Sequence, residues 1–327
     1  MASEAEFVPA QVDSEKINPF AHLFNVKLRP RVKPPVGEKA MLKHEFSEYF
    51  QKAAIKEKLE NLHWKAYEEV PRSSVPFGKR ILRPMTAYDI KYNDRGEIEK
   101  FKTRVCLDGS RTVVPETETY ECIASFATIR FLLCFAARYG MDVVQTDVKN
   151  FFLQARMPEG KEYYAEIPTG WAENDPATHV AKCLAPWYGL KESAKIAGDQ
   201  LAELLVKAGM KENPLMPKVF FRWDGDDFIA CACHIDDAVW ISTSMKKLDA
   251  VLDKVEETFK MVRTYEPTKL LGIEIQYDKA RGVMKLHQGS YMRAKLMELG
   301  HKAINRKTDS PGYIPPKVDN PEWKGGV

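Results

Sequence analysis

The chain has 327 residues, of which 44% are hydrophobic and 29% charged, a composition that fits a globular protein of two or three sub-domains around a sizeable core. Its most apolar run, residues 129–144, contains Arg130, Arg138 and Asp142, which excludes a membrane-spanning helix there. The net charge is only +3, but residues 112–240 carry 19 acidic and 12 basic residues between basic segments. A nucleic-acid clamp around a metal-binding centre would show this distribution. Chance fluctuation of the charges explains it equally well.

The six cysteines form no CxxC pair and sit mostly in apolar surroundings, which is typical of a reducing compartment. We therefore expect an intracellular protein, cytoplasmic or nuclear, without membrane attachment. The run Cys231-Ala232-Cys233-His234 invites a zinc hypothesis, but a structural zinc site needs four ligands and the chain has no second CxxC or HxxxH pair. We interpret this run as a buried strand.

Five prolines and mostly polar residues mark the first 44 residues as a leader or linker, expected to be poorly ordered. Residues 45–67, which are rich in Lys, Glu and Ala, predict a helix. A hairpin follows, with strands at 85–92 and 97–107 on either side of a polar turn at 93–96.

The central part of the chain is predicted to contain two apolar helices and four strands, three of them in succession. Ser125 is expected to cap a helix that Gly140 ends, and a strand at 142–148 follows at once. Another helix ends at Gly209. A three-stranded meander is predicted next, over residues 218–223, 227–234 and 238–242.

The last third begins with an amphipathic helix that Ser244 should cap. Its inward face consists of Leu248, Val251, Leu252, Val255 and Phe259. A hairpin at 269–277 and 283–287, a short helix ending near Gly300 and an irregular tail at 301–327 complete the chain. Because strands and helices are grouped rather than strictly alternating, the sequence predicts an α+β fold.

Three aspartates stand where predicted strands end. Asp147 lies at the end of the strand at 142–148, and Asp236 and Asp237 occupy the bend between two apolar strands. Taken singly, each is most simply a turn residue that bonds its own backbone. Two adjacent acids in a tight bend repel each other, however, and a divalent cation removes that repulsion. Two Mg²⁺ ions held by carboxylates and phosphates promote phosphoryl transfer, so these acids are candidate metal ligands. The sequence leaves open whether Asp147 meets the pair in space.

Several ordered motifs between about residues 57 and 300 resemble the reverse transcriptase of copia-type retrotransposons. The motifs are Lys102-x-Arg104 with Gly109, Thr128-Ile129-Arg130-x-Leu132-Leu133, Gln145-x-Asp147-Val148-x-x-x-Phe152-Leu153, Tyr188-Gly189-Leu190-Lys191, His234-Ile235-Asp236-Asp237, Leu271-Gly272-Ile273-Glu274-Ile275 and Gln288-x-x-Tyr291. The fourth is similar to the family's YGLK motif, and the fifth stands where the family has YVDD. Any one of them is weak, and their shared order makes the resemblance specific.

The resemblance implies a right-hand polymerase fold within residues 45–300, with an antiparallel palm sheet packed on helices. The fingers would span about 57–120, the palm about 121–243, and the end of the palm with the start of the thumb 244–300. The implied activity is RNA-directed DNA polymerisation, a nucleotidyl transfer with two Mg²⁺ ions, or Mn²⁺ in their place. Its partners would be a primed RNA or DNA template, deoxynucleoside triphosphates and other segments of a Gag-Pol polyprotein.

The resemblance also implies roles for single residues. Asp147, Asp236 and Asp237 would be the catalytic acids and would bind the metal ions, together with the carbonyl of Val148. Phe152 would be the steric gate that excludes a 2′-hydroxyl; without the motif it would be a plain core aromatic. The residues that would contact the incoming nucleotide are Lys102, Arg104, Phe152, Gly189, Lys191 and Glu192, and those near the primer end are His234, Leu271 and Gly272.

Some residues depart from the family pattern. His234 replaces a tyrosine, and Glu192 replaces a glutamine, which puts a negative charge toward the nucleotide and should weaken triphosphate binding. Phe151 replaces a small residue beside the gate and should crowd the pocket, and Asp108 puts an acid near the triphosphate. The alternative function is therefore that of a catalytically impaired or repurposed transposon-derived protein that binds nucleic acid without polymerising.

Overall fold

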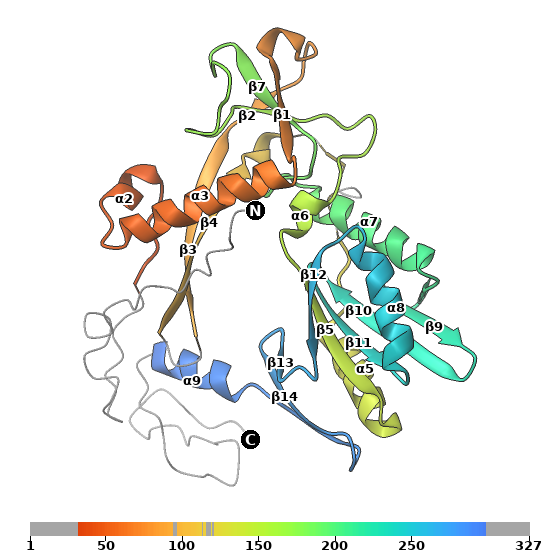
Figure 1. Ribbon diagram of the computed structural model, residues 1–327. Coiled ribbons are helices and arrows are strands. Elements are labelled where there is room, and N and C mark those ends of the chain that lie inside the picture. Colours follow the sequence, from red (N-terminus) through yellow and green to blue (C-terminus); the bar gives the residue numbers. More distant parts are fainter. Residues whose placement is uncertain (1–31, 94–96, 113, 116–118, 120, 299–327) are drawn as a thin grey trace, which may run out of the picture.

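The structure is a computed structural model that describes residues 32–93, 97–112, 114–115, 119 and 121–298. Within these residues the protein combines helices with four sheets, of which the largest is antiparallel, and this is compatible with the predicted α+β class (Figure 1). The predictions for residues 1–31, for the turn at 94–96 and for the tail at 301–327 fall outside the described residues. In the described part of the chain, no helix combines the length and the apolar character needed to cross a membrane.

A helix and a hairpin form the first packed unit. Helix α3 (Ser47–His63) and the hairpin of β3 (Pro84–Tyr92) and β4 (Ile98–Leu107) confirm two predicted elements. The hairpin packs on α3 through a small cluster around Phe50, which is fully buried. A short helix, α2 (Glu38–Leu42), lies within the segment expected to be a leader.

A four-stranded sheet was not predicted from the sequence. Its order is β1-β7-β6-β2, and β2 and β6 are a parallel pair of two-residue strands. Trp171 and Trp187 belong to its core cluster. The elements of this region are β1 (Tyr67–Pro71), β2 (Ile81–Leu82), β6 (Tyr164–Ala165), β7 (His179–Cys183) and the 3₁₀ turns η1 (Arg72–Ser74) and η2 (Gly109–Arg111).

The central sheet has six antiparallel strands in the order β12-β5-β11-β10-β9-β8. The strands are β5 (Asp142–Val148), β8 (Lys211–Glu212), β9 (Val219–Asp224), β10 (Asp227–His234), β11 (Asp237–Ser242) and β12 (Met261–Tyr265). The predicted strand at 142–148 and the predicted meander are confirmed, whereas β8 and β12 were not predicted.

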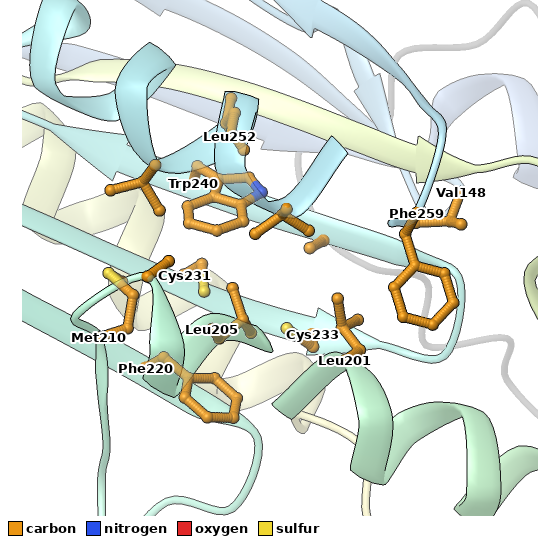
Figure 2. Packing of buried hydrophobic residues seen from close by; sticks show 14 of the residues in the cluster. Val148, Leu201, Leu205, Met210, Phe220, Cys231, Cys233, Trp240, Leu252 and Phe259 are labelled. Atoms are coloured by element: carbon orange, nitrogen blue, oxygen red, sulfur yellow. The ribbon is translucent and has the colours of Figure 1, made fainter. Parts of the chain in front are cut away.

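Alternating side chains of the central sheet supply two separate cores. On one face, α7 (Ser193–Lys207) and α8 (Met245–Glu256) cover a cluster that contains Trp240 and Phe259 (Figure 2). On the other face, α5 (Phe126–Tyr139) and the C-terminal strands cover a second cluster, formed by the intervening residues. The sheet that carries the three aspartates is therefore packed on both sides.

Cys231 and Cys233 confirm the buried-strand interpretation of their run. Both side chains lie in the first core, next to Leu205 and Leu201 (Figure 2). Both are buried and neither forms a disulfide. Burial raises the pKa of the Cys231 thiol well above its usual value, so it stays protonated and behaves as a small apolar side chain.

Helix α5 begins and ends at the predicted residues. Ser125 Oγ accepts a hydrogen bond from Thr128 N at 3.1 Å, and Gly140 ends the helix with φ 62° in the left-handed region. Ser244 is the N-cap residue of α8, as predicted, but its side chain makes no capping hydrogen bond. Instead, Ser244 N donates to Ser242 Oγ at 3.0 Å, which fixes the entry to the helix through the backbone.

The predicted C-terminal hairpin is confirmed, but its first strand is divided in two. The break falls at Leu271 and Gly272, whose φ values of 47° and 79° cannot continue a strand. The elements are β13 (Lys269–Leu270), β14 (Ile273–Asp278), β15 (Val283–His287) and helix α9 (Gly289–Glu298).

Candidate active site

The bend between β10 and β11 is a two-residue turn under backbone strain. His234 and Asp237 form the last strand pair, so Ile235 and Asp236 make the turn. Ile235 has φ 59°, a conformation that a β-branched side chain disfavours. The paired strands on both sides stabilise this conformation, and the turn places Asp236 at the end of the hairpin.

Strand β5 brings Asp147 beside this turn. In the register of β5 and β11, Asp147 is the direct partner of Asp237. Val148 N donates a hydrogen bond to Asp236 O at 2.9 Å. Directly opposite residues of an antiparallel pair have Cβ atoms about 4.5–5.5 Å apart. The structure thus brings together the two distant stretches of chain that carry the three aspartates.

The three carboxylates repel one another. Burial and the neighbouring Asp236 carboxylate raise the pKa of Asp147, although one side of Asp147 is open to solvent. Burial also raises the pKa of Asp237, and the charges of Asp236 and Asp147 raise it further. Gln145 Nε2 donates to Asp237 Oδ1 at 3.1 Å and opposes this shift. Negative charge is therefore concentrated at one end of the central sheet.

This donor set fits a divalent cation that arrives with a phosphate ligand. Within the described residues, no three His, Cys, Asp or Glu side chains are already arranged around one metal position. Mg²⁺ does not require such a cage, because proteins commonly bind it through one or two carboxylates plus water and substrate phosphates. Hard oxygen ligands that repel one another and are open on one side are suited to that mode of binding.

Lys102 and Arg104 are two residues apart on β4, so their side chains lie on the same face of the strand, as their spacing predicts. The positive charge of Lys102 acts on Asp147 and opposes the rise of its pKa. Burial and the nearby Arg104 lower the pKa of Lys102. The Arg104 guanidinium lies 5.6 Å from the ring centroid of Tyr188. The charge of Lys102 thus reaches Asp147, and Arg104 lies next to Lys102 on the same strand face, which suits a ligand that is itself anionic.

Phe152 lies on the short helix α6 (Phe151–Gln154), just after β5. Its ring is half-buried, 5.0 Å from the ring of Tyr188 between centroids. Burial raises the pKa of Tyr188 to about 12. The expectation that Phe151 crowds the pocket is wrong, because its side chain points into the first core and is 3% exposed. Successive residues of a helix point in different directions, so only the second phenylalanine reaches Tyr188.

The YGLK motif packs closely against β4. Leu107 N donates to Tyr188 O at 2.7 Å, and a Cβ added to Gly189 (φ 91°) would lie 2.2 Å from Leu107 O. Lys191 Nζ donates to Thr112 O at 2.7 Å. Gly189 and Lys191, predicted as nucleotide contacts, here attach the motif to the hairpin. Tyr188 was not among the predicted site residues, although its place in the motif was the available signal.

The two acids that depart from the family pattern are both compensated. The Glu192 side chain is 2% exposed, and its Oε1 lies 3.2 Å from Lys161 Nζ. Asp108 Oδ1 accepts a hydrogen bond from Ser110 N at 3.1 Å and caps the turn η2. Neither carboxylate therefore presents an unpaired charge.

The three residues predicted near the primer end lie in two places. His234 Nδ1 is 3.3 Å from Ala124 O, which ties the end of β10 to the start of α5. Leu271 and Gly272 form the break between β13 and β14. Leu271 packs on the second core, on the sheet face that also bears Asp147.

Comparison with known proteins covers most of this structure. The family model described as reverse transcriptase (RNA-dependent DNA polymerase) matches residues 67–309 of the 327. The chain belongs to this family. The match includes both strands that carry the aspartates, the hairpin with Lys102 and the YGLK motif.

Curated relatives place it among copia-type elements. The Retrovirus-related Pol polyprotein from transposon RE1 of Arabidopsis thaliana is 25% identical over 186 residues, 56% of this chain and 13% of that protein. The corresponding polyprotein from transposon TNT 1-94 of Nicotiana tabacum is 22% identical over 271 residues, 82% of this chain and 20% of that protein. Transposon RE2 of Arabidopsis thaliana gives 25% over 186 residues, again 56% of this chain and 13% of the relative. The chain spans a fifth or less of the length of these polyproteins.

Proposed function

We propose that this chain is an RNA-directed DNA polymerase that extends a primer on an RNA or DNA template by two-metal nucleotidyl transfer. The observation that carries the proposal is the direct pairing of Asp147 with Asp237 beside Asp236. Membership of the reverse transcriptase family supports it. In this reaction the primer 3′-hydroxyl attacks the α-phosphorus of a deoxynucleoside triphosphate, and pyrophosphate leaves.

The aspartates would hold two Mg²⁺ ions. Asp147 and Asp236 would be the main ligands, with Asp237 beside them and the Val148 carbonyl as a further oxygen. When bound, the ions make the 3′-hydroxyl a better nucleophile and neutralise the leaving pyrophosphate. Burial and, after it, mutual repulsion raise the pKa of Asp147 and of Asp237, and bound ions would offset that repulsion.

The hairpin would bind and select the incoming nucleotide. Lys102 and Arg104 would pair with the triphosphate, for which a guanidinium and an ammonium supply complementary charge. Tyr188 contacts both Arg104 and Phe152: its ring centroid lies 5.6 Å from the Arg104 guanidinium and 5.0 Å from the Phe152 ring centroid. Phe152 would exclude a ribose 2′-hydroxyl from the position next to Asp147.

In this proposal the elements would make up a right-hand polymerase. The hairpin and the four-stranded sheet would form the fingers, the central sheet the palm, and the segment from β13 to α9 the start of the thumb. His234, Leu271 and Gly272 would contact the primer end. The relatives are Pol polyproteins, so we expect other segments of such a polyprotein, in the cytoplasm or nucleus, to act with this chain.

Primer extension tests the proposal. Purified protein with a primed template, Mg²⁺ and deoxynucleotides should extend the primer. Asp236→Asn should slow extension at least about 100-fold, because a metal-held charge contributes several kcal/mol to the transition state. Asp226→Asn, at an exposed position in the turn between β9 and β10, is the matched control and should retain the activity. Absence of extension by the unmodified protein, or equal losses in the two variants, would contradict the proposal.

Nucleic-acid binding without polymerisation is the second candidate function. Glu192 favours it, because an acid occupies a motif position that would otherwise offer a neutral amide to the nucleotide. This function predicts salt-sensitive binding of a primed duplex with no extension at any Mg²⁺ concentration. The pairing of Glu192 with Lys161 makes the polymerase the better-supported candidate.

A further inference from the structure

Helix α3 contacts the hairpin and the loop before α6, the two segments that border the proposed nucleotide site, through two carboxylates. Glu57 Oε1 accepts a hydrogen bond from Val105 N of β4 at 3.3 Å. Glu60 Oε2 accepts one from Asn150 Nδ2 at 2.7 Å. Residues three apart on a helix share one face, so a single face of α3 meets the hairpin and the loop before α6. In Figure 1, α3 runs across the hairpin toward α6.

Asn150 shapes the loop that positions the steric gate. It has φ 51° and ψ 42°, a left-handed conformation that asparagine adopts more readily than most residues. Its carbonyl accepts hydrogen bonds from Leu153 N at 2.8 Å and Gln154 N at 3.3 Å, which form the single turn of α6. Phe152 lies inside that turn. A displacement of Asn150 therefore displaces the gate.

The two carboxylates of α3 hold the two segments that contact the Tyr188 ring. Glu57 attaches to β4 at the residue after Arg104, whose guanidinium lies 5.6 Å from the ring centroid of Tyr188. Glu60 attaches to the loop that carries Phe152, whose ring lies 5.0 Å from the same tyrosine. Helix α3 therefore helps to fix both the strand beside Tyr188 and the loop that carries Phe152, and so the position of the gate relative to Tyr188.

We propose that Glu60 is a positioning residue whose hydrogen bond to Asn150 sets how far Phe152 reaches toward the sugar of the incoming nucleotide, and hence the preference for deoxyribonucleotides over ribonucleotides. This inference rests on the proposed polymerase function. Glu60 itself touches no substrate and acts through the loop. A displacement of about 1 Å at a reacting group can change a rate by about 100-fold, so a modest shift of the gate is enough to alter selection.

Single-nucleotide incorporation tests this role. The measured quantity is the ratio of kcat/KM for a deoxynucleotide to kcat/KM for the matching ribonucleotide. Asn150→Asp places a second carboxylate against Glu60 and should lower the ratio about tenfold. Combining Asn150→Asp with Glu60→Gln exchanges donor and acceptor, and should restore the ratio to within about threefold of the original. Glu48→Gln removes an exposed charge from the same helix and should leave the ratio unchanged.

Stability and nucleotide binding separate the possible outcomes. A purely structural role would lower the Tm and both kcat/KM values of Asn150→Asp together, with an unchanged ratio, and would overturn the proposal. Failure of the double variant to recover the ratio would also overturn it. A parallel competition assay uses a fluorescent deoxynucleotide bound to the Mg²⁺-loaded protein on a primed duplex. It compares how strongly unlabelled deoxynucleotide and ribonucleotide triphosphates displace the label, and the ratio of these two affinities is the displacement ratio. No extension by the unmodified protein refutes the polymerase, whereas an unchanged displacement ratio in Asn150→Asp refutes the role of Glu60.

Discussion

Replacing Asp237 with asparagine should stabilise the metal-free protein while it removes DNA synthesis. Asp237 lies directly opposite Asp147 and next to Asp236, and both charges act on it. Asparagine keeps the Oδ1 atom that accepts the hydrogen bond from Gln145 at 3.1 Å. The substitution therefore removes charge repulsion without breaking the contact that orients the side chain.

The size of the effect follows from the strand pairing. Like charges on neighbouring strands destabilise a sheet by about 0.2–1 kcal/mol for each pair. Asp237→Asn relieves one such cross-strand repulsion, with Asp147, and also the repulsion from Asp236, its neighbour along the chain. In this partly solvated site the free energy of unfolding should therefore rise by about 0.4–2 kcal/mol. For a chain of this size that change corresponds to a Tm increase of about 0.6–3 °C. Adding Mg²⁺ should raise the Tm of the unmodified protein more than that of the variant.

The direction of the pH dependence follows from the raised pKa values. Folding raises the pKa of Asp147 and of Asp237, so the folded state binds more protons than the unfolded state between the ordinary and the raised values. The free energy of unfolding therefore falls as the pH rises through that window, and the full penalty remains at neutral pH. Asp237→Asn should make this fall smaller.

Thermal unfolding followed by circular dichroism, with EDTA or with Mg²⁺, measures both effects. Asp226→Asn, which also removes one carboxylate from a hairpin turn, should leave the Tm within about 1 °C of the original. A Tm for Asp237→Asn that falls below that of the unmodified protein in EDTA would refute the reasoning. So would an equal response of the two proteins to Mg²⁺.

Three further substitutions test other parts of the structure. Phe152→Ala should raise ribonucleotide incorporation relative to deoxynucleotide incorporation at least about tenfold, measured by single-nucleotide kinetics, because the ring that blocks a 2′-hydroxyl is gone. Lys102→Ala should raise the KM for deoxynucleotides about tenfold or more through the loss of a charged contact, while duplex affinity, measured by fluorescence anisotropy, stays within about twofold; equal losses in both would count against the assigned site. Lys218→Met should lower the free energy of unfolding, measured by denaturant titration, by about 3–5 kcal/mol, because it leaves Glu121 buried without its partner at 2.9 Å. The double variant Lys218→Met with Glu121→Leu should recover most of the loss.

Local sequence patterns predicted the elements that carry the aspartates. The strands at 142–148 and 227–234 are apolar runs bounded by turn residues, so periodicity and turn chemistry agree there. The register that places Asp147 opposite Asp237 was not readable from either strand alone. It depends on the packing of both sheet faces, because a slip by one residue would exchange the two cores.

The elements that escaped prediction lack a local signal. Strands β2 and β6 have two residues each and are defined by pairing across the chain. Strand β12 lies at the sheet edge and is largely exposed, so its alternation of apolar and polar residues is weak. The roles of Glu57 and Glu60 were likewise hidden, because on a Lys- and Glu-rich helix only the partners in β4 and before α6 distinguish them from solvated charges.

The acids that depart from the family pattern bear directly on the metal hypothesis. Glu192 pairs with Lys161, and Asp108 caps a turn. These charges are each compensated inside the fold and do not compete for a cation. Within the described residues, by contrast, no ion pair engages Asp147, Asp236 or Asp237, and the charge of Lys102 only partly offsets the raised pKa of Asp147. The three aspartates therefore stay in mutual repulsion between β5 and β11, where a divalent cation with a nucleotide would supply the missing positive charge.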